Sequence, residues 1–263
     1  MTEIIIPILI LGALGLIFGV GLAIASKRLA VQVDPRLEKI CGLLPGSNCG
    51  ACGGAGCFGF AEGLLSGKMS VDGCKVSEEA VREKIAELLG QKLDKKVKRV
   101  AALHCNGGAK VKDRFIYKGI GDCVAANLVL GGQKSCVFGC LGFGDCVKIC
   151  PFGSLAMSKE GLPEIDKDKC KACNKCVIAC PKKLFSLMPV THNIYVACMS
   201  HDAGKDTKSV CAVGCIACSL CVKACKFDAI HVIDNLAVID DKKCTSCGEC
   251  VKACPVKTIR MRS

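Results

Sequence analysis

The sequence has no tryptophan, only 2 tyrosines, and 4% aromatic residues in total. Proteins that bind single-stranded nucleic acids stack bases on aromatic side chains, so this lack argues against a nucleic-acid partner. It also leaves little large apolar mass for a hydrophobic core. We therefore expect bound cofactors to supply much of the free energy of folding.

Motifs for chemistry by the side chains themselves are also missing. We find no dinucleotide-binding fingerprint and no phosphate loop. Gly12 and Gly15 lie in an apolar segment, where close helix packing explains them better. The histidines are scattered, and we expect structural roles for all of them: His104, His192, His201 and His231. The sequence therefore predicts no catalytic residue and no complete active site on this chain.

Cysteine, by contrast, is abundant, with 25 in 263 residues. Such density is typical of disulfide scaffolds, zinc sites or iron–sulfur clusters. Disulfide bridges need no regular spacing, and zinc ribbons pair two C-x2-C knuckles across a long gap. Here three runs repeat the C-x2-C-x2-C-x3-C spacing of bacterial ferredoxins, which favours [4Fe–4S] clusters. These runs are Cys170–Cys180, Cys215–Cys225 and Cys244–Cys254.

The spacing also predicts which cysteines share a cluster. In two-cluster ferredoxins the fourth cysteine of a run binds the neighbouring cluster, so we pair the runs. Lys226 stands where the other two runs have proline after the fourth cysteine. The predicted ligand sets are Cys170, Cys173 and Cys176 with Cys150; Cys244, Cys247 and Cys250 with Cys225; and Cys215, Cys218 and Cys221 with Cys254.

A fourth run, Cys136–Cys150, is irregular because Phe143 stands where the middle cysteine is expected. An internal repeat makes residues from about 100 to 263 two ferredoxin-like units, each preceded by a short apolar strand that ends in cysteine. We predict that Cys136 replaces the missing ligand and joins Cys140, Cys146 and Cys180. Four cysteines are then unassigned, and they either hold one more cluster between the repeats or are free buried thiols: Cys105, Cys123, Cys198 and Cys211.

A different cysteine pattern precedes the ferredoxin-like units. Cys49, Cys52, Cys57 and Cys74 follow a C-x2-C-x4-C-x16-C spacing in a glycine-rich segment. Glycines let the backbone approach an inorganic core closely and donate N–H bonds to its sulfurs, so we predict one [4Fe–4S] cluster here. The alternative is a glycine-rich turn with incidental cysteines. We expect Cys41, outside this pattern, to be a free thiol.

The number of clusters bears on the net charge of +12, which alone would suggest nucleic acid as a partner. An oxidised cluster with its four thiolates carries about −2, so six clusters would contribute about −12. Five clusters are predicted and a sixth is the open question. Much of the lysine therefore compensates for cofactors, and we expect no nucleic-acid partner.

The amino-terminal segment 4–25 has 22 residues without a charge, enough to cross a bilayer as a helix. Lys27 and Arg28 follow at once, and the positive-inside rule then puts the bulk of the chain in the cytoplasm. A cleaved signal peptide is the alternative, but no basic region precedes the apolar stretch. One helix cannot enclose an ion pathway, so this chain alone is neither pump nor channel.

Between these modules, residues 77–91 read as an amphipathic helix capped by Ser77, with Val81, Ile85, Leu88 and Leu89 on one face. A basic run follows. It is either a solvated linker or a docking patch for an acidic electron carrier such as ferredoxin. The run consists of Lys92, Lys95, Lys96, Lys98 and Arg99.

The order of these modules resembles that in the B subunits of the Rnf complexes. Three phrases carry the likeness: the glycine-rich segment 44–53; His104-Cys105-Asn-Gly-Gly; and Cys136-Val-Phe-Gly-Cys140-Leu-Gly-Phe-Gly-Asp-Cys146. The resemblance implies an electron-transfer subunit of an ion-translocating ferredoxin:NAD oxidoreductase of the cell membrane. It also implies soluble ferredoxin as electron donor, and other subunits that hold the flavins, the NAD site and the path for Na⁺ or H⁺.

The fold class that follows is α+β, with small domains stapled by cofactors. We expect a transmembrane anchor at 1–28, a four-cysteine [4Fe–4S] domain with its amphipathic helix at 29–92, and ferredoxin-like units at 93–190 and 191–263. Two alternatives have other functions. One is a membrane-anchored polyferredoxin of a different redox complex, and the other is an iron–sulfur redox sensor, which would need one labile cluster rather than a series.

Overall fold

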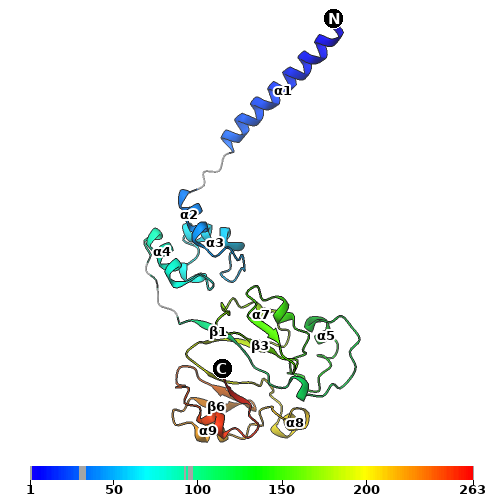
Figure 1. Ribbon diagram of the computed structural model, residues 1–263, viewed down its shortest axis with the longest axis vertical. Helices are drawn as coiled ribbons and strands as arrows, with labels where there is room; N and C mark the ends of the chain where they lie inside the picture. Colours follow the sequence, from blue (N-terminus) through cyan, green and yellow to red (C-terminus); the bar gives the residue numbers. More distant parts are fainter. Residues whose placement is uncertain (1, 30–33, 92, 94–96, 263) are drawn as a thin grey trace.

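The structure, a computed structural model, describes residues 2–29, 34–91, 93 and 97–262 (Figure 1). It begins with helix α1, Thr2–Arg28. Within the described residues, Leu9–Arg28 is the one stretch long and apolar enough to span a membrane, with a mean hydropathy of 2.4 and none of it buried. At about 1.5 Å per residue, such a helix matches the roughly 30 Å hydrocarbon core of a bilayer. It fits a single-pass anchor.

A small helical domain follows. Its elements are α2 (Pro35–Leu43), α3 (Gly56–Leu65), the 3-10 turn Val71–Gly73 and α4 (Glu79–Leu89). The start of α2 is fixed by Asp34, whose carboxylate accepts the Arg36 N–H at 2.9 Å. The helices enclose a core built around Ile40, Phe60 and Ile85.

Helix α4 starts later than the sequence predicts. Glu78 is its N-cap, and no side chain caps the helix. The buried Ser77 hydroxyl instead donates to the Cys74 carbonyl at 3.3 Å. It therefore stabilises the loop before the helix and does not cap the helix. Ile85 is buried as expected, whereas Leu88 is exposed. Of the basic run, Lys92, Lys95 and Lys96 lie outside the described residues.

The rest of the chain contains two similar sets of elements. The first set consists of β1 (Arg99–Leu103), α6 (Asp145–Lys148), β2 (Leu155–Met157), β3 (Pro163–Ile165), α7 (Lys175–Ala179) and β4 (Phe185–Pro189). The second consists of β5 (Ile194–Val196), α9 (Leu220–Ala224), β6 (Ile230–Ile233), β7 (Leu236–Ile239), α10 (Glu249–Ala253) and β8 (Ile259–Met261). We call them the first and second units. Two further helices stand before α6 and α9: α5 (Cys123–Leu128) and α8 (Gly204–Val210).

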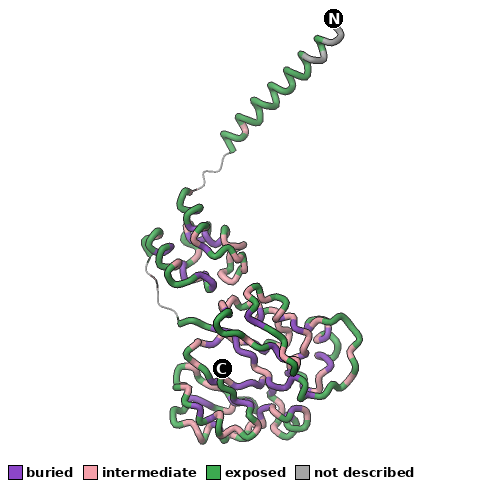
Figure 2. Tube along the Cα trace, in the orientation of Figure 1, coloured by how far each residue is buried: buried purple, intermediate pink, exposed green. Residues whose placement is uncertain are grey.

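Each unit pairs its strands in the same way. The outer strands form one antiparallel ladder, β1 with β4 and β5 with β8, and the inner strands form a hairpin, β2 with β3 and β6 with β7. Two-stranded sheets are marginal alone, so the residues between them must supply the rest of the stability. Buried segments follow these strands and the cysteine loops, whereas α1 is exposed (Figure 2).

Polar contacts join the two units. His104, at the end of β1, lies 2.7 Å from the Ser186 hydroxyl through Nε2 and 2.7 Å from the Val196 carbonyl of β5 through Nδ1. Arg260 of β8 donates to the Asn106 side chain at 2.7 Å. His104 therefore has the structural role expected from the sequence, and it fixes the chain between the end of β1 and Cys105.

Candidate iron–sulfur sites

The loops of the three regular runs share one backbone conformation. In each, the residues just before and just after the second cysteine have positive φ. The pairs are Ala172 and Asn174, Ala217 and Ser219, and Ser246 and Gly248. Left-handed residues alternating with right-handed ones turn successive N–H groups into a concave nest that binds anions, including iron–sulfur cores. The spacing is therefore realised as a loop that aims its N–H groups and three thiols inward.

The fourth cysteine of each run sits in a second shared turn. The residue three positions later has positive φ in every case, and the next N–H reaches back to the sulfur. Leu184 donates to Cys180 at 3.5 Å, Thr258 to Cys254 at 3.3 Å, and Ala229 to Cys225 at 3.5 Å. The turn after Cys225 persists although Lys226 replaces proline.

These loops bring the cysteines together in sets of four. Five cavities are each lined by four cysteines, and we number the sites by their place along the molecule. Site 1 has Cys49, Cys52, Cys57 and Cys74; site 3 has Cys123, Cys140, Cys146 and Cys180; site 4 has Cys105, Cys136, Cys198 and Cys211; site 5 has Cys215, Cys218, Cys221 and Cys254; and site 6 has Cys225, Cys244, Cys247 and Cys250.

Site 2 gathers the remaining predicted set, Cys150, Cys170, Cys173 and Cys176. Cys150, Cys170 and Cys176 belong to one core cluster. Burial raises the pKa of Cys173, and charges on Cys150 and Cys170 add to the rise. Burial likewise raises the pKa of Cys176 to about 12, with Cys170 and Cys173 next in effect. Sites 1, 2, 5 and 6 group the same cysteines as the sets predicted from spacing, and binding of clusters by these sets stays a prediction.

Sites 3 and 4 differ from the predicted grouping, because Cys123 and Cys136 exchange places. The irregular run folds like the others: Gly142 and Gly144 flank Phe143 with φ of 85° and 78°. Phe143 thus occupies the backbone position of a second cysteine, and its ring packs edge-on against Tyr117 at 5.7 Å. Cys123 packs in the same apolar cluster as Tyr117 and Phe143, and it supplies the fourth thiol of site 3.

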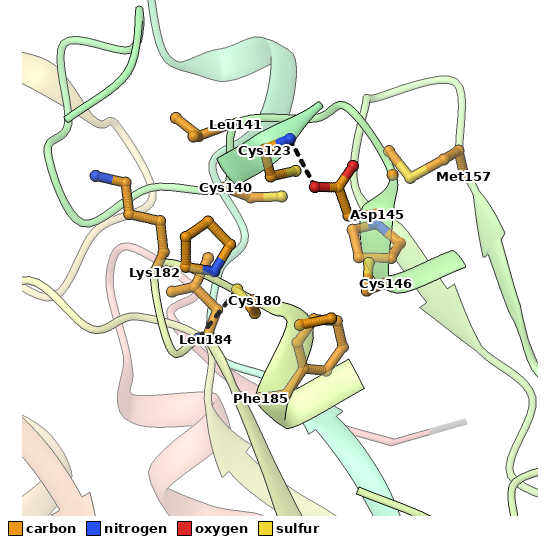
Figure 3. A pocket seen from close by; sticks show the side chains of 14 residues that line it. Cys123, Cys140, Leu141, Asp145, Cys146, Met157, Cys180, Lys182, Leu184 and Phe185 are labelled. Atoms are coloured by element: carbon orange, nitrogen blue, oxygen red, sulfur yellow. Dashed lines mark hydrogen bonds between the residues drawn. The ribbon is translucent and has the colours of Figure 1, made fainter. Parts of the chain in front are cut away.

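Asp145 holds Cys123 in place. Its carboxylate accepts the Cys123 N–H at 2.8 Å, which fastens the first turn of α5 to α6 (Figure 3). The close view shows the cysteines of site 3 around one apolar cavity, with Leu184 and Phe185 below them in the picture. Cys136 lies outside this cavity, in site 4.

Site 4 is shared by both units with a twofold pattern. Cys105 and Cys198 each follow the first strand of a unit, just beyond Leu103 of β1 and Val196 of β5, and each sulfur accepts an N–H from a neighbouring site. Cys140 N–H donates to Cys105 at 3.4 Å, and Cys215 N–H donates to Cys198 at 3.3 Å. Of the four cysteines left unassigned by spacing, three therefore meet here, and Cys136 completes the set.

Site 1 depends on its glycines. Gly50, Gly53 and Gly56 all have φ above 70°. A Cβ on Gly56 would lie 2.8 Å from the Asn48 side chain, whose oxygen accepts the Cys57 N–H at 2.7 Å. These positions need glycine because the backbone has positive φ and passes close to the cavity of site 1. Cys41 lies on α2 outside the cavity lining, and burial raises the pKa of its thiol.

The donor sets fit polynuclear clusters. Across the described residues, no three Cys, His, Asp or Glu side chains gather closely enough for a single metal ion, yet thiols in fours face common cavities. Burial raises the pKa of Cys140 and of Cys146 to about 12, so these thiols stay protonated without metal. Binding of a cluster must therefore displace their protons.

The grouping of sites 3 and 4 has a direct test in pairs of cysteine-to-serine changes. Replacing Cys123 and Cys140 together is expected to remove one cluster, about four iron atoms per chain, because both thiols belong to site 3. Replacing Cys136 and Cys140 together is expected to remove about eight, because two sites are broken. Iron analysis of the anaerobically purified variants gives the answer, and the reverse pattern would restore the grouping expected from spacing.

Family models match three parts of the chain. An Fe–S cluster model matches residues 44–76, a 4Fe-4S binding domain matches 162–185, and a 4Fe-4S dicluster domain matches 214–258. The first covers site 1, and the last spans the runs of sites 5 and 6. The chain therefore contains Fe–S and 4Fe–4S ferredoxin-like domains in a structure of mixed helices and strands.

Relatives match over the whole chain. The B subunit of the Na⁺-translocating ferredoxin:NAD⁺ oxidoreductase complex of Acetobacterium woodii is 43% identical, over 98% of this chain and 78% of that protein. The B subunit of the ion-translocating oxidoreductase complex of Methanosarcina acetivorans is 40% identical, over 100% of both. The B subunit of the proton-translocating ferredoxin:NAD⁺ oxidoreductase complex of Clostridium ljungdahlii is 44% identical, over 93% and 87%. The chain therefore belongs to the family of B subunits of the ion-translocating oxidoreductase (Rnf) complexes.

Proposed function

We propose that this chain is the electron-transfer subunit of a membrane complex that oxidises reduced ferredoxin, reduces NAD⁺ and couples the reaction to movement of Na⁺ or H⁺. It accepts electrons from ferredoxin and relays them to the other subunits, which hold the NAD site and the ion path. The observation that carries this proposal is the arrangement of the six cysteine sites in one series, each close to the next.

The first half of the series runs from site 1 to site 3. Cys173 of site 2 packs against the core of the small helical domain, and charge on Cys49 of site 1 contributes to its raised pKa, after burial. Charge on Cys146 of site 3 contributes in the same way to the pKa of Cys176. Sites 1, 2 and 3 are therefore consecutive neighbours.

The second half runs from site 3 to site 6. The Cys140 N–H bond to Cys105 joins site 3 to site 4, and the Cys215 N–H bond to Cys198 joins site 4 to site 5. Burial raises the pKa of Cys250 in site 6 to about 11, and Cys221 of site 5 is among the thiols that add to the rise. Site 4 is thus the bridge between the two units.

We propose a [4Fe–4S] cluster in each of the six sites, including site 4. When bound, such a cluster supplies reversible one-electron oxidation and reduction. The chain holds the thiolates, and its apolar linings keep water out. N–H donors to sulfur, as at Cys254 and Cys198, stabilise negative charge there and so raise the local reduction potential.

The domain boundaries and the orientation in the membrane also belong to this proposal. The anchor is 1–28, the helical domain 29–92, and the units 93–190 and 191–263. Lys27 and Arg28, in the last turn of α1, support a cytoplasmic position for everything after them. Soluble ferredoxin is then within reach of the cysteine sites.

The basic run is our proposed docking patch for ferredoxin. Its described end lies near site 6: the Lys98 carbonyl accepts the Val190 N–H at 2.8 Å, and nearby Asn193 donates to Ser246 of the site 6 loop at 3.3 Å. Cys247 of that loop is exposed. Ferredoxin held by these charges would sit beside site 6.

Reversing two of these charges tests the patch. Lys98→Glu with Arg99→Glu is expected to raise the KM for ferredoxin about tenfold at low salt. Iron content and kcat should change little, because these charges attract ferredoxin before it binds and take no part in later electron transfer. The effect should shrink as salt is added. Lys159→Glu with Lys167→Glu, on the β2–β3 side of the first unit, is the matched control. An unchanged KM would rule the patch out.

The function itself is tested on the assembled complex. An affinity tag on this chain is expected to bring down membrane subunits that reduce NAD⁺ with electrons from reduced ferredoxin. Recovery of a complex that oxidises ferredoxin but delivers the electrons to another acceptor would contradict the proposal, and would favour a polyferredoxin of a different redox complex.

A further inference from the structure

The first unit carries an extra segment that the second lacks. Cys105 and Cys136 of site 4 are 31 positions apart, whereas their counterparts Cys198 and Cys211 are 13 apart. About 18 residues are therefore added. They lie within residues 113–134, and we call this whole segment the insert. The second unit holds its clustered cysteines without such a segment, so most of the insert is not needed to build site 4.

The insert is a fixed structure. Its ends pair through the Asp113–Lys134 bridge, and the Arg114 N–H donates to the Gln133 carbonyl at 2.8 Å. The Lys182 ammonium donates to the Gly131 carbonyl at 2.6 Å. Its inner face packs Cys123 and Ala126 against Leu141. The conformation of its outer face is therefore defined.

That outer face is apolar. Ile116, Ile120, Leu128 and Leu130 are 85%, 71%, 82% and 77% exposed, and Val124 lies four residues before Leu128 on the same face of α5. The insert forms the side of the first unit around α5 (Figure 1), where the trace is largely exposed (Figure 2). Large exposed apolar side chains gathered in one short segment are typical of interaction sites.

The position and charge of this face indicate what covers it. Cys123, the first residue of α5, belongs to site 3, so a partner on the outer face comes within one helix of a redox site. Residues 105–150 contain six lysines and arginines against three aspartates. Three of these cations are paired within the chain, Lys110 with Glu160, Lys134 with Asp113 and Lys148 with Asp145. Lys112, Arg114 and Lys118 are exposed beside the apolar residues. The complementary surface is apolar with a rim of carboxylates.

We propose that the outer face of the insert is the docking surface for another protein subunit of the same complex. This inference rests on the proposed function, which makes the chain part of a multisubunit assembly. Permanent interfaces are more apolar than the transient ones formed with soluble electron carriers, so the face suits a resident subunit rather than ferredoxin. Docking there places the docked protein next to site 3.

The test is assembly of the complex around a tagged full-length chain. Ile120→Ser with Leu128→Ser is expected to reduce co-purifying subunits at least about tenfold, because central apolar contacts dominate such interfaces. Iron per tagged chain should be unchanged, which shows that the variant folds. Ile233→Ser, an exposed isoleucine of β6 in the second unit, is the control and should assemble normally. Full co-purification with the double variant would overturn the proposal.

Photo-crosslinking from the same face separates a protein from a lipid surface. Benzoylphenylalanine introduced at position 128 is expected to crosslink to a protein subunit, identified by mass spectrometry, and at position 233 it should not. Crosslinks to lipid alone, or none, would overturn the docking proposal. A native tagged chain that brings down no other subunit would instead overturn the proposed function, and the docking proposal with it.

Discussion

Replacing Cys198 and Cys211 by serine is expected to lower ferredoxin-dependent NAD⁺ reduction by more than about 100-fold while removing only about four iron atoms per chain. Both thiols belong to site 4, which joins the two units. Without site 4, electrons that enter at site 6 cannot pass from the second unit to site 3 of the first unit. The measurement is the rate of NAD⁺ reduction by the purified complex, alongside iron content.

The control for this experiment is Cys41→Ser. Cys41 is a cysteine of the same protein outside every cavity that we describe, so both activity and iron should stay at the native level. A site 4 variant with native activity would show that the bridge is not part of the route. A variant that loses far more than four iron atoms would show that site 4 holds the units together as well.

Removing the iron is expected to unfold the two units. Cysteines of the sites are themselves part of the two cores, including Cys146, Cys170, Cys215 and Cys250. The sheets between them have only two strands each. Domain stability is about 5–15 kcal/mol in total, and binding of a structural metal site alone is worth a comparable amount. Chelation under oxidising conditions should therefore expose residues 97–262 to protease.

Helix α1 provides the internal reference for that experiment. It makes no use of cysteine, so in detergent its helical signal should survive chelation while the rest of the circular dichroism spectrum collapses. Protease protection of the two units that persists in the iron-free chain would contradict a fold built on its cofactors. Reconstitution with iron and sulfide should restore the protection.

The regular cysteine runs were predictable because spacing alone determines their loops. In a C-x2-C-x2-C run of this protein, positive φ on both sides of the middle cysteine turns the loop so that its three thiols face one point. The structure has this at Ala172 and Asn174 and at the equivalent positions of the other runs. Fourth cysteines then cross over, as Cys150 and Cys254 do.

The exchange of Cys123 and Cys136 was not predictable from spacing. Cys123 reaches site 3 through the insert, and its position depends on the Asp145 carboxylate and on Phe143 packing against Tyr117. Neither contact leaves a periodic signal. One clue is present in the sequence, however: Lys134-Ser-Cys136 resembles Lys208-Ser-Val-Cys211. The structure places Cys136 and Cys211 in the same site.

The measurement that tests the account most directly is iron, acid-labile sulfide and zinc per polypeptide in the anaerobically purified native protein. Six [4Fe–4S] sites predict about 24 iron and about 24 sulfide per chain, with no stoichiometric zinc. A value near 20 iron would mean that one of the six sites is empty, and would contradict a complete series. Stoichiometric zinc with little iron would contradict electron transfer altogether.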